Sequence, residues 1–359
     1  MRRFVGVAFV AILVAGIVIG AVSTGLISFA PKPRTTPTIH VNISWSITSY
    51  LPYTYVGVIA DKMGYWKAEG LDVANVMVAG GPAAAKALSA GDSDIMYGGW
   101  GAAAAAASAG APLRIIATLG QYTPYNLVVQ PRIHSIQDLV GASWAVESVG
   151  GVSWEYALIW LEAVHLGKGA VNFVVAGSPA DRGRALIAGK VDASLLYDDQ
   201  LNETLKEKPD LRILRNYVQM AQEAGAPSQV VFATRDDVLN NKPEMIDAFL
   251  RGWLKANRDV RENKDLFLKM SDLDFAGPKL PRSQLEKLWQ GYKDNDYFAV
   301  NGGIRKDLMN TYATKYYNLV NPEAKKLNFD QLVDYRPLAR VLKDLGTVQG
   351  SWDVPDYPI

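Results

Sequence analysis

The chain has 359 residues, of which 49% are hydrophobic and 20% are charged, and its formal net charge is +1. This length and composition are globular and sufficient for two lobes with separate cores, and the balanced charge argues against nucleic acid or an acidic surface as a partner. The absence of cysteine excludes disulfides, thiolate catalysis and a lipid-modified cysteine.

The N-terminal residues are expected to place the chain at a membrane. Residues 4–30 carry no charge, a stretch longer than the core of a typical signal peptide and long enough to span a bilayer. Arg2 and Arg3 precede it and predict a cytoplasmic N-terminus with the rest of the chain outside. We expect an uncleaved transmembrane anchor over 1–30 and a short stiff linker over 31–37. A cleaved signal segment and a secreted protein are the alternative, because small residues occur at the spacing of a cleavage site.

Beyond the linker, strand and helix patterns alternate, which is typical of an α/β protein with parallel-rich sheets. The predicted strands of the first part are 41–47, 73–78, 95–97 and 114–117, and the predicted helices are 53–68, 83–90 and 102–109. Gly80-Gly81 and Gly98-Gly99 each stand between a strand and the following helix. Glycine lets a ligand approach the backbone and a helix N-terminus offers free N–H groups, so both turns are candidate binding positions. Tight turning alone is the alternative for each pair.

A sequence repeat divides the rest of the chain into two lobes. "VAGGPAAAKALSAGDSDIMY" (78–97) returns as "VAGSPADRGRALIAGKVDASLLY" (175–197), and the elements before each copy also correspond. Before the second copy these elements are a strand at 142–146, a helix at 152–165 and a strand at 171–175. We therefore expect two similar α/β lobes that face each other across a cleft.

Two passages are expected to join the lobes. Residues 120–124 separate predicted strands at 114–117 and 126–130, and residues 225–228 precede a strand at 229–233. The expected organisation is lobe 1 over 38–126 and 227–359, with lobe 2 over 127–226. The last part of lobe 1 is predicted to be helical, with helices from Pro243, over 282–293 and over 306–317, and an irregular end from about residue 346.

Four segments resemble a known family. "GYWKAEGLDV" (64–73), "GAPLRIIA" (110–117), "IQDLVGASWAV" (136–146) and "KPEMIDAFLRGWLKA" (242–256) stand in the order found in substrate-binding proteins of ABC importers for nitrate, sulfonates, taurine and related compounds. The resemblance covers roughly residues 38–265. It implies the type II periplasmic-binding-protein fold, in which the second lobe is inserted in the first and two crossings allow the lobes to close around one ligand.

Catalysis finds little support in the sequence. Relatives of the resembled family include a pyrimidine-forming enzyme of thiamine biosynthesis and a desulfinase, whose known versions depend on cysteine, and this chain has none. His40, His134 and His165 are far apart, and none has a metal-ligand partner at helical spacing. Ser153 lies in "GGVSWE", which lacks the second glycine of a nucleophile elbow. We expect a protein that is not an enzyme and that has no cofactor and no metal.

Polar, aromatic and glycine residues at the ends of predicted strands form the candidate ligand site. They are Ser46, Ser49, Tyr50, Gly80, Gly81, Gly99, Trp100, Tyr122, Thr123, Glu147, Ser148, Gly150, Gly151, Tyr197 and Asp198, with Ser178 and Asp199 at the same strand ends. Trp100 has an alternative role as a wedge at the lobe interface, Tyr197 as a core residue, and Asp198 as a helix cap. Arg182 is the nearest cation, and we expect it on a solvated helix face.

These residues leave the ligand class open. Helix N-termini with glycine favour an oxyanion such as a sulfonate or nitrate, while the aromatic side chains favour a flat ring. Glu147 with Asp198 favours a cationic or N–H-bearing group. A zwitterion such as taurine, or a pyrimidine-type vitamin precursor related to thiamine, would satisfy both demands.

The resulting hypothesis is an extracytoplasmic solute-binding receptor of an ABC importer. It would act as a monomer at the outer face of the cell membrane, capture a small organic solute or oxyanion by hinge closure, and deliver it to the membrane permease. Its partners would be the ligand and an ABC permease subunit, with no nucleic acid. The alternatives are a membrane-tethered ligand sensor and a binding protein for an aromatic vitamin precursor such as the thiamine pyrimidine.

Overall fold

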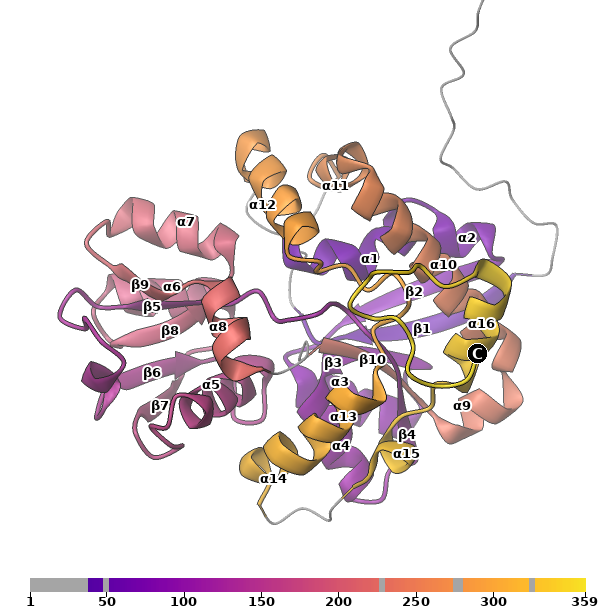
Figure 1. The fold of residues 1–359 in the computed structure, drawn as a ribbon, viewed down its shortest axis with the longest axis horizontal. Helices are drawn as coiled ribbons and strands as arrows, with labels where there is room; N and C mark the ends of the chain where they lie inside the picture. Colours follow the sequence, from indigo (N-terminus) through magenta and orange to yellow (C-terminus); the bar gives the residue numbers. More distant parts are fainter. Residues whose placement is uncertain (1–37, 48–51, 226–229, 274–279, 323–326) are drawn as a thin grey trace, which may run out of the picture.

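The computed structural model describes residues 38–47, 52–225, 230–273, 280–322 and 327–359. Their elements form two α/β lobes that lie side by side, with strands β5–β9 and helices α5–α8 in one lobe and the other elements in the second (Figure 1). The anchor expected over 1–30 and the linker expected over 31–37 lie outside the described residues. Among the helices that are described, none is both long and apolar enough to cross a membrane.

Lobe 1 contains a five-stranded sheet with the strand order β2-β1-β3-β10-β4. The strands are β1 (Ile39–Trp45), β2 (Leu71–Met77), β3 (Ile95–Gly99), β4 (Leu113–Thr118) and β10 (Val230–Arg235). β1 pairs in parallel with β2 and β3, whereas β10 is antiparallel to both β3 and β4. The sheet is therefore mixed rather than parallel throughout, because β10 enters it on the return from the other lobe.

Lobe 2 repeats this arrangement in a sheet with the order β7-β6-β8-β5-β9. The strands are β5 (Asn126–Val129), β6 (Ser143–Val146), β7 (Asn172–Val175), β8 (Ala193–Leu196) and β9 (Arg212–Arg215). β6 is parallel to β7 and β8, and β5 is antiparallel to β8 and β9. β5 and β10 thus occupy equivalent places, since each is the first strand after the chain has crossed between lobes.

Helices connect the strands of both lobes in the same order. They are α1 (Tyr55–Lys62), α2 (Tyr65–Ala68), α3 (Gly81–Ala90) and α4 (Trp100–Ser108) in lobe 1, and α5 (Val152–Ala163), α6 (Pro179–Ile187), α7 (Asp198–Glu207) and α8 (Tyr217–Ala224) in lobe 2. The first copy of the sequence repeat forms α3 and β3, and the second forms α6 and β8. α6 begins at a capping box, in which Ser178 Oγ accepts a hydrogen bond from the Asp181 N–H and the Asp181 carboxylate accepts one from the Ser178 N–H, both at 3.2 Å.

The C-terminal part of the chain is helical and belongs to lobe 1. It contains α9 (Asp236–Asn241), α10 (Pro243–Glu262), α11 (Lys264–Met270), α12 (Arg282–Asp294), α13 (Lys306–Thr311), the π-helical segment η3 (Tyr312–Tyr316), α14 (Tyr317–Val320), α15 (Phe329–Leu332) and α16 (Arg336–Leu345). α10 packs against α1, α2 and α16, and the fully buried Trp253 donates from Nε1 to the Val56 carbonyl at 2.8 Å. The chain end folds back onto this lobe, where the buried Asp353 accepts from the N–H groups of Asn301 and Gly303 at 2.7 and 3.0 Å.

Two predicted helices are interrupted in the structure. The segment predicted as one helix over 53–68 forms a 3₁₀ turn η1 (Pro52–Thr54), α1 and α2, because Gly64 adopts a left-handed conformation between the two helices with φ of 77°. The segment predicted over 306–317 forms α13, η3 and the start of α14. The irregular end agrees with expectation, since no helix or strand follows α16.

Candidate functional site

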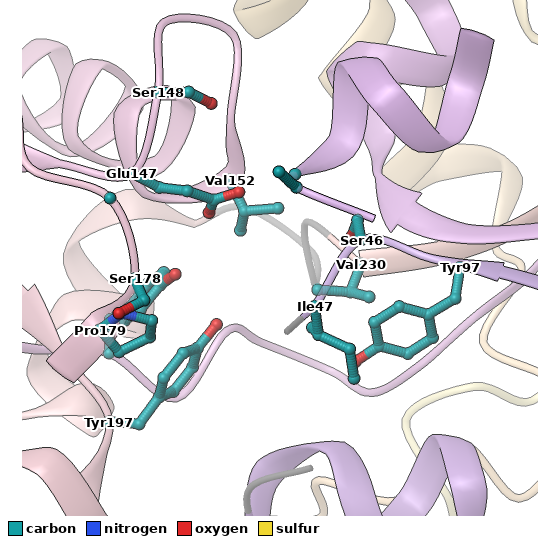
Figure 2. A pocket seen from close by; sticks show the side chains of 14 residues that line it. Ser46, Ile47, Tyr97, Glu147, Ser148, Val152, Ser178, Pro179, Tyr197 and Val230 are labelled. Atoms are coloured by element: carbon teal, nitrogen blue, oxygen red, sulfur yellow. The ribbon is translucent and has the colours of Figure 1, made fainter. Parts of the chain in front are cut away.

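A cavity of about 200 Å³ lies between the two lobes. Figure 2 shows side chains from both lobes around it. Its walls come from the carboxyl ends of strands in the two sheets, which is where ligands gather in open α/β sheets. A molecule held in this cavity would therefore touch both lobes at once.

The lobe 1 wall follows the order of its sheet. Its lining residues are Ser46 and Ile47 after β1, Ala79 and Gly80 after β2, Tyr97 in β3 and Val230 at the start of β10. Gly80 has φ of 84°, and a Cβ at this position would lie 2.8 Å from Glu147 Oε1 of the opposite lobe. The bare backbone of Gly80 is thus what lets the lobes approach each other here.

The lobe 2 wall uses the equivalent strand ends. Its lining residues are Glu147 and Ser148 after β6, Gly177, Ser178 and Pro179 after β7, Tyr197 after β8, Tyr125 before β5 and Val152 at the start of α5. Tyr125 and Tyr197 stack with their ring centroids 4.3 Å apart. Together with Tyr97 across the cavity, they give it three aromatic side chains with hydroxyl groups.

Glu147 provides the only charged side chain among the lining residues. Its backbone N–H donates to Ser153 Oγ at 2.8 Å, which fixes the start of the loop between β6 and α5. Its side chain extends into the cavity in Figure 2. Burial raises the pKa of Glu147 above its ordinary value, and the nearby Arg182 charge opposes that rise.

Arg182 lies in the interior of lobe 2, behind the residues that line the cavity. The expectation of a solvated helix face is wrong, because this side chain is fully buried. Its guanidinium donates to the Leu195 carbonyl at 3.1 and 3.3 Å and to the Gly177 carbonyl at 3.0 Å. It also bonds to the hydroxyl of Tyr125, whose pKa burial raises to about 12. Arg182 therefore braces the wall and is not among the residues that line the cavity.

A second carboxylate, Glu155 of α5, joins lobe 2 to lobe 1 beside the cavity. Glu155 Oε2 accepts from the Gly101 N–H in the first turn of α4 at 3.3 Å and from the Tyr312 hydroxyl at 3.4 Å. The side chain is almost fully buried, and desolvation raises its pKa to about 8. A Cβ at Gly101 would lie 1.5 Å from Glu155 Oε1, so the carboxylate occupies the space that a side chain at this position would need. The sequence analysis did not identify Glu155.

Six of the residues proposed from the sequence line the cavity, namely Ser46, Gly80, Glu147, Ser148, Ser178 and Tyr197. Ser49 and Tyr50 lie outside the described residues. Four glycines lie near the wall without lining it. Gly81 faces Ala102, Gly99 faces Val152 and Glu155, Gly150 faces Pro82 and Gly151 faces Ser148.

The remaining proposed residues lie away from this cavity. Trp100 is buried against Tyr312, with ring centroids 3.8 Å apart, and its Nε1 lies 3.3 Å from Met309 Sδ. Tyr122 stacks on Tyr217 beside a separate cavity of about 440 Å³. Thr123 is buried in the crossing before β5. Asp198 lies in the first turn of α7, where Tyr197 is the N-cap, and accepts from Asn126 Nδ2 at 2.8 Å.

Several lining residues were not predicted from the sequence, although the sequence repeat indicates one of them. Tyr97 ends the first copy of the repeat as Tyr197 ends the second, so the choice of Tyr197 should have brought Tyr97 with it. Ile47, Val152 and Val230 are ordinary apolar residues, and Tyr125 lies in the crossing. Nothing in the sequence separates these four from residues of the core.

The sequence of this chain is similar to one known family. Residues 52–265, more than half of the chain, match the sequence model of the family described as NMT1/THI5 like. No curated protein matches the chain significantly.

Solved structures with the same fold are distant in sequence. The periplasmic aliphatic sulphonate-binding protein of Escherichia coli is 18% identical, with a TM-score of 0.57 over 83% of this chain and 92% of that one. The periplasmic nitrate-binding protein of Synechocystis PCC 6803 is 13% identical, with a TM-score of 0.62 over 86% and 89% of the two chains. A desulfurization enzyme is 15% identical, with a TM-score of 0.54 over 85% and 99%. These likenesses establish the periplasmic-binding-protein architecture.

Proposed function

Because the chain belongs to the NMT1/THI5-like family, we propose that it is a solute-binding receptor of an ABC importer. It captures one small solute between its lobes on the extracytoplasmic side of the membrane and delivers it to a permease. The observation that carries the proposal is the cavity whose two walls come from equivalent strand ends of two lobes. A ligand makes all its contacts only when the lobes are close together, so it favours the closed form.

The chemistry of the cavity favours binding over turnover. Ser46, Ser148 and Ser178 offer hydroxyl groups, yet no histidine, lysine or cysteine stands among the lining residues to activate one of them. Within the described part of the chain, no group of three or more histidine, aspartate or glutamate side chains is placed to hold a metal ion. Hydrogen-bond partners and aromatic surface without an activated nucleophile are what a receptor needs.

The same cavity favours an organic solute with a flat body over a bare oxyanion such as nitrate. Tyr97, Tyr125 and Tyr197 supply ring faces and edges, and Ile47, Val152 and Val230 supply apolar surface. Sulfonates and taurine remain candidates through their apolar parts, and an aromatic vitamin precursor of the thiamine-pyrimidine kind is the second candidate because it presents a ring.

A thermal-shift panel on the full chain tests the receptor function. The panel contains taurine, alkyl sulfonates, nitrate, thiamine and its pyrimidine precursor. A solute at a hundredfold excess over its dissociation constant adds about 2.7 kcal/mol to the free energy of unfolding. Ala79→Phe places a ring in the cavity and should abolish the shift, whereas Ala109→Phe, at the exposed end of α4, should retain it. A solute that stabilises Ala79→Phe as well as it stabilises the wild type would contradict the site.

A further inference from the structure

The interface between the lobes carries an excess of acidic side chains. Besides Glu147 and Glu155, Asp198 and Asp199 lie in the first turn of α7, directly after the lining residue Tyr197, without lining the cavity themselves. Across the described residues, none of these four carboxylates forms an ion pair with a lysine, arginine or histidine side chain. Burial raises the pKa of all four above the ordinary value.

The nearest cation, Arg182, acts on Glu147 from behind the wall and does not line the cavity. Arg182 directs its hydrogen bonds to the carbonyls of Gly177 and Leu195 and to Tyr125. The lining residues include no lysine, arginine or histidine. Among the described residues, a ligand therefore meets three tyrosines, three serines and the Glu147 carboxylate, and no lysine, arginine or histidine.

A negative charge and a positive charge on a ligand would have opposite effects on binding next to Glu147. An anionic ligand would stand beside a carboxylate in a partly desolvated cavity, where like charges repel more strongly than in water. A protonated nitrogen would give the Glu147 oxygens a donor that no residue of the described part of the chain provides, and it would gain from the faces of neighbouring tyrosines. The loop after β2 strengthens this discrimination, because Gly80 closes over Glu147 Oε1 and limits its access to solvent.

We propose that the solute of this cavity is a small organic cation, with a flat body among Tyr97, Tyr125 and Tyr197 and a protonated nitrogen that donates to Glu147. The proposal rests on the receptor function above and names its ligand class. It separates this chain from the sulphonate- and nitrate-binding proteins that share its fold, since those ligands are anions. Neutral solutes of the same shape are bound more weakly because they leave the carboxylate without a counter-charge.

Three probes that share a ring and differ in charge test the ligand class. Benzamidinium, benzamide and benzoate carry charges of about +1, 0 and −1 at neutral pH, with the charged group attached at the same ring position. Calorimetric titration of the full chain should give benzamidinium a dissociation constant at least about tenfold below that of benzamide, with benzoate weakest. Glu147→Gln keeps the shape of the side chain and should remove that advantage while it leaves benzamide unchanged.

A matched variant separates local from long-range electrostatics. Glu162→Gln removes the same charge from an exposed position of α5 outside the cavity and should leave the order of the three probes intact. The proposal is overturned if benzoate binds as well as benzamidinium, if Glu147→Gln retains the preference, or if benzamidinium does not bind at all. A sulfonate that binds and compacts the protein would also overturn the ligand class while it supports the receptor function. Failure of every solute to close the lobes would instead refute the receptor function.

Discussion

Gly101 shows at the scale of one residue how the lobes meet. It lies in the first turn of α4 with helical backbone, and the Glu155 carboxylate of the other lobe occupies the space where a side chain would begin. The N–H groups at the start of a helix have no partners within the helix, so a carboxylate placed there is stabilised by both hydrogen bonding and the helix dipole. Lobe 2 thus supplies a cap to a helix of lobe 1.

Gly101→Ala should lower ligand affinity without lowering the stability of α4. Alanine favours a helix over glycine by about 0.5–1 kcal/mol, so α4 itself should not be weakened. The new Cβ would collide with Glu155 Oε1, and overpacking of about 1–3 kcal/mol should lower ligand affinity about 5- to 150-fold. Calorimetry and denaturant unfolding measure the two effects. Gly169→Ala, where the added methyl group meets nothing, is the control and should change neither.

Glu155 should make closure sensitive to pH. The groups that face it are the Gly101 N–H from α4, the Tyr312 hydroxyl from η3 and the Glu147 carboxylate from its own lobe. Since the pKa of Glu155 is about 8 in this structure, where it contacts both lobes, and its ordinary value is 4.5, formation of this contact takes up a proton between these limits. The stabilisation is fully present below pH 4.5 and is lost as the pH rises through about 8.

Titration of ligand affinity against pH in Glu155→Gln tests this linkage. The ratio of wild-type to variant affinity should fall by up to about tenfold per pH unit across the interval, because the variant has no proton to gain. Comparison of the two proteins cancels the titration of the ligand. Parallel pH profiles would show that Glu155 has the same protonation in both forms.

At the scale of elements, η3 joins the helical tail of lobe 1 to lobe 2. The Tyr312 hydroxyl contacts Glu155, and the Tyr316 hydroxyl donates to the Ala224 carbonyl at the end of α8 at 2.6 Å. The π-helical turn changes the phase of the helix between α13 and α14, and such turns occur often at functional positions. The tail therefore takes part in the contact between the lobes as well as in the core of its own lobe.

Tyr316→Phe and Tyr317→Phe form a matched pair for this contact. Tyr316 bonds across the lobes, whereas the Tyr317 hydroxyl donates to the Ala104 carbonyl of its own lobe at 3.1 Å. Each variant removes one hydrogen bond from a hydroxyl to a carbonyl and should lower the free energy of unfolding by about 1 kcal/mol. Only Tyr316→Phe should also weaken ligand binding, by about fivefold or more. Equal affinities in the two variants would place the tail outside the closing movement.

The elements also show what the sequence can predict. α10 was predicted from Pro243 and a continuous apolar face, and both signals are local. The breaks at Gly64 and at η3 were not predicted, because a helical pattern continues through each of them. At the site, strand ends in the repeat pointed to Glu147 and Tyr197. Glu155 was missed because its partner, Gly101, is distant in the sequence and the contact depends on how the lobes are packed.

For the whole molecule, the equivalent topologies of the two sheets give each lobe a complete sheet of its own, so the closure proposed above would move two separate bodies. In the sequence the chain passes between them twice, between β4 and β5 and between α8 and β10. Movement at two short crossings changes the distance between the walls and leaves the pairing within each sheet intact.

Small-angle scattering should detect this movement. The radius of gyration of the full chain should fall when a bound solute saturates the cavity, because ligand contacts with both walls favour the closed form. Ala79→Phe, measured at the same solute concentration, should show no ligand-dependent change. A wild-type protein that binds a solute tightly at constant radius would rule out hinge closure as the mechanism of capture.

The position of β10 between β3 and β4 also has a consequence for how the protein acquires its shape during synthesis. Every strand of lobe 2 is contained in one uninterrupted stretch, from β5 to β9, whereas lobe 1 lacks a central strand until residue 235 has been made. We expect lobe 2 to fold first and the incomplete lobe 1 sheet to wait for it, with the edges of β3 and β4 unpaired in the meantime. Pulsed hydrogen exchange during refolding should then protect amides in β5 and β8 before those in β10, and simultaneous protection would refute the order. Lobe 2, whose sequence is inserted in that of lobe 1, would therefore be the first lobe to fold.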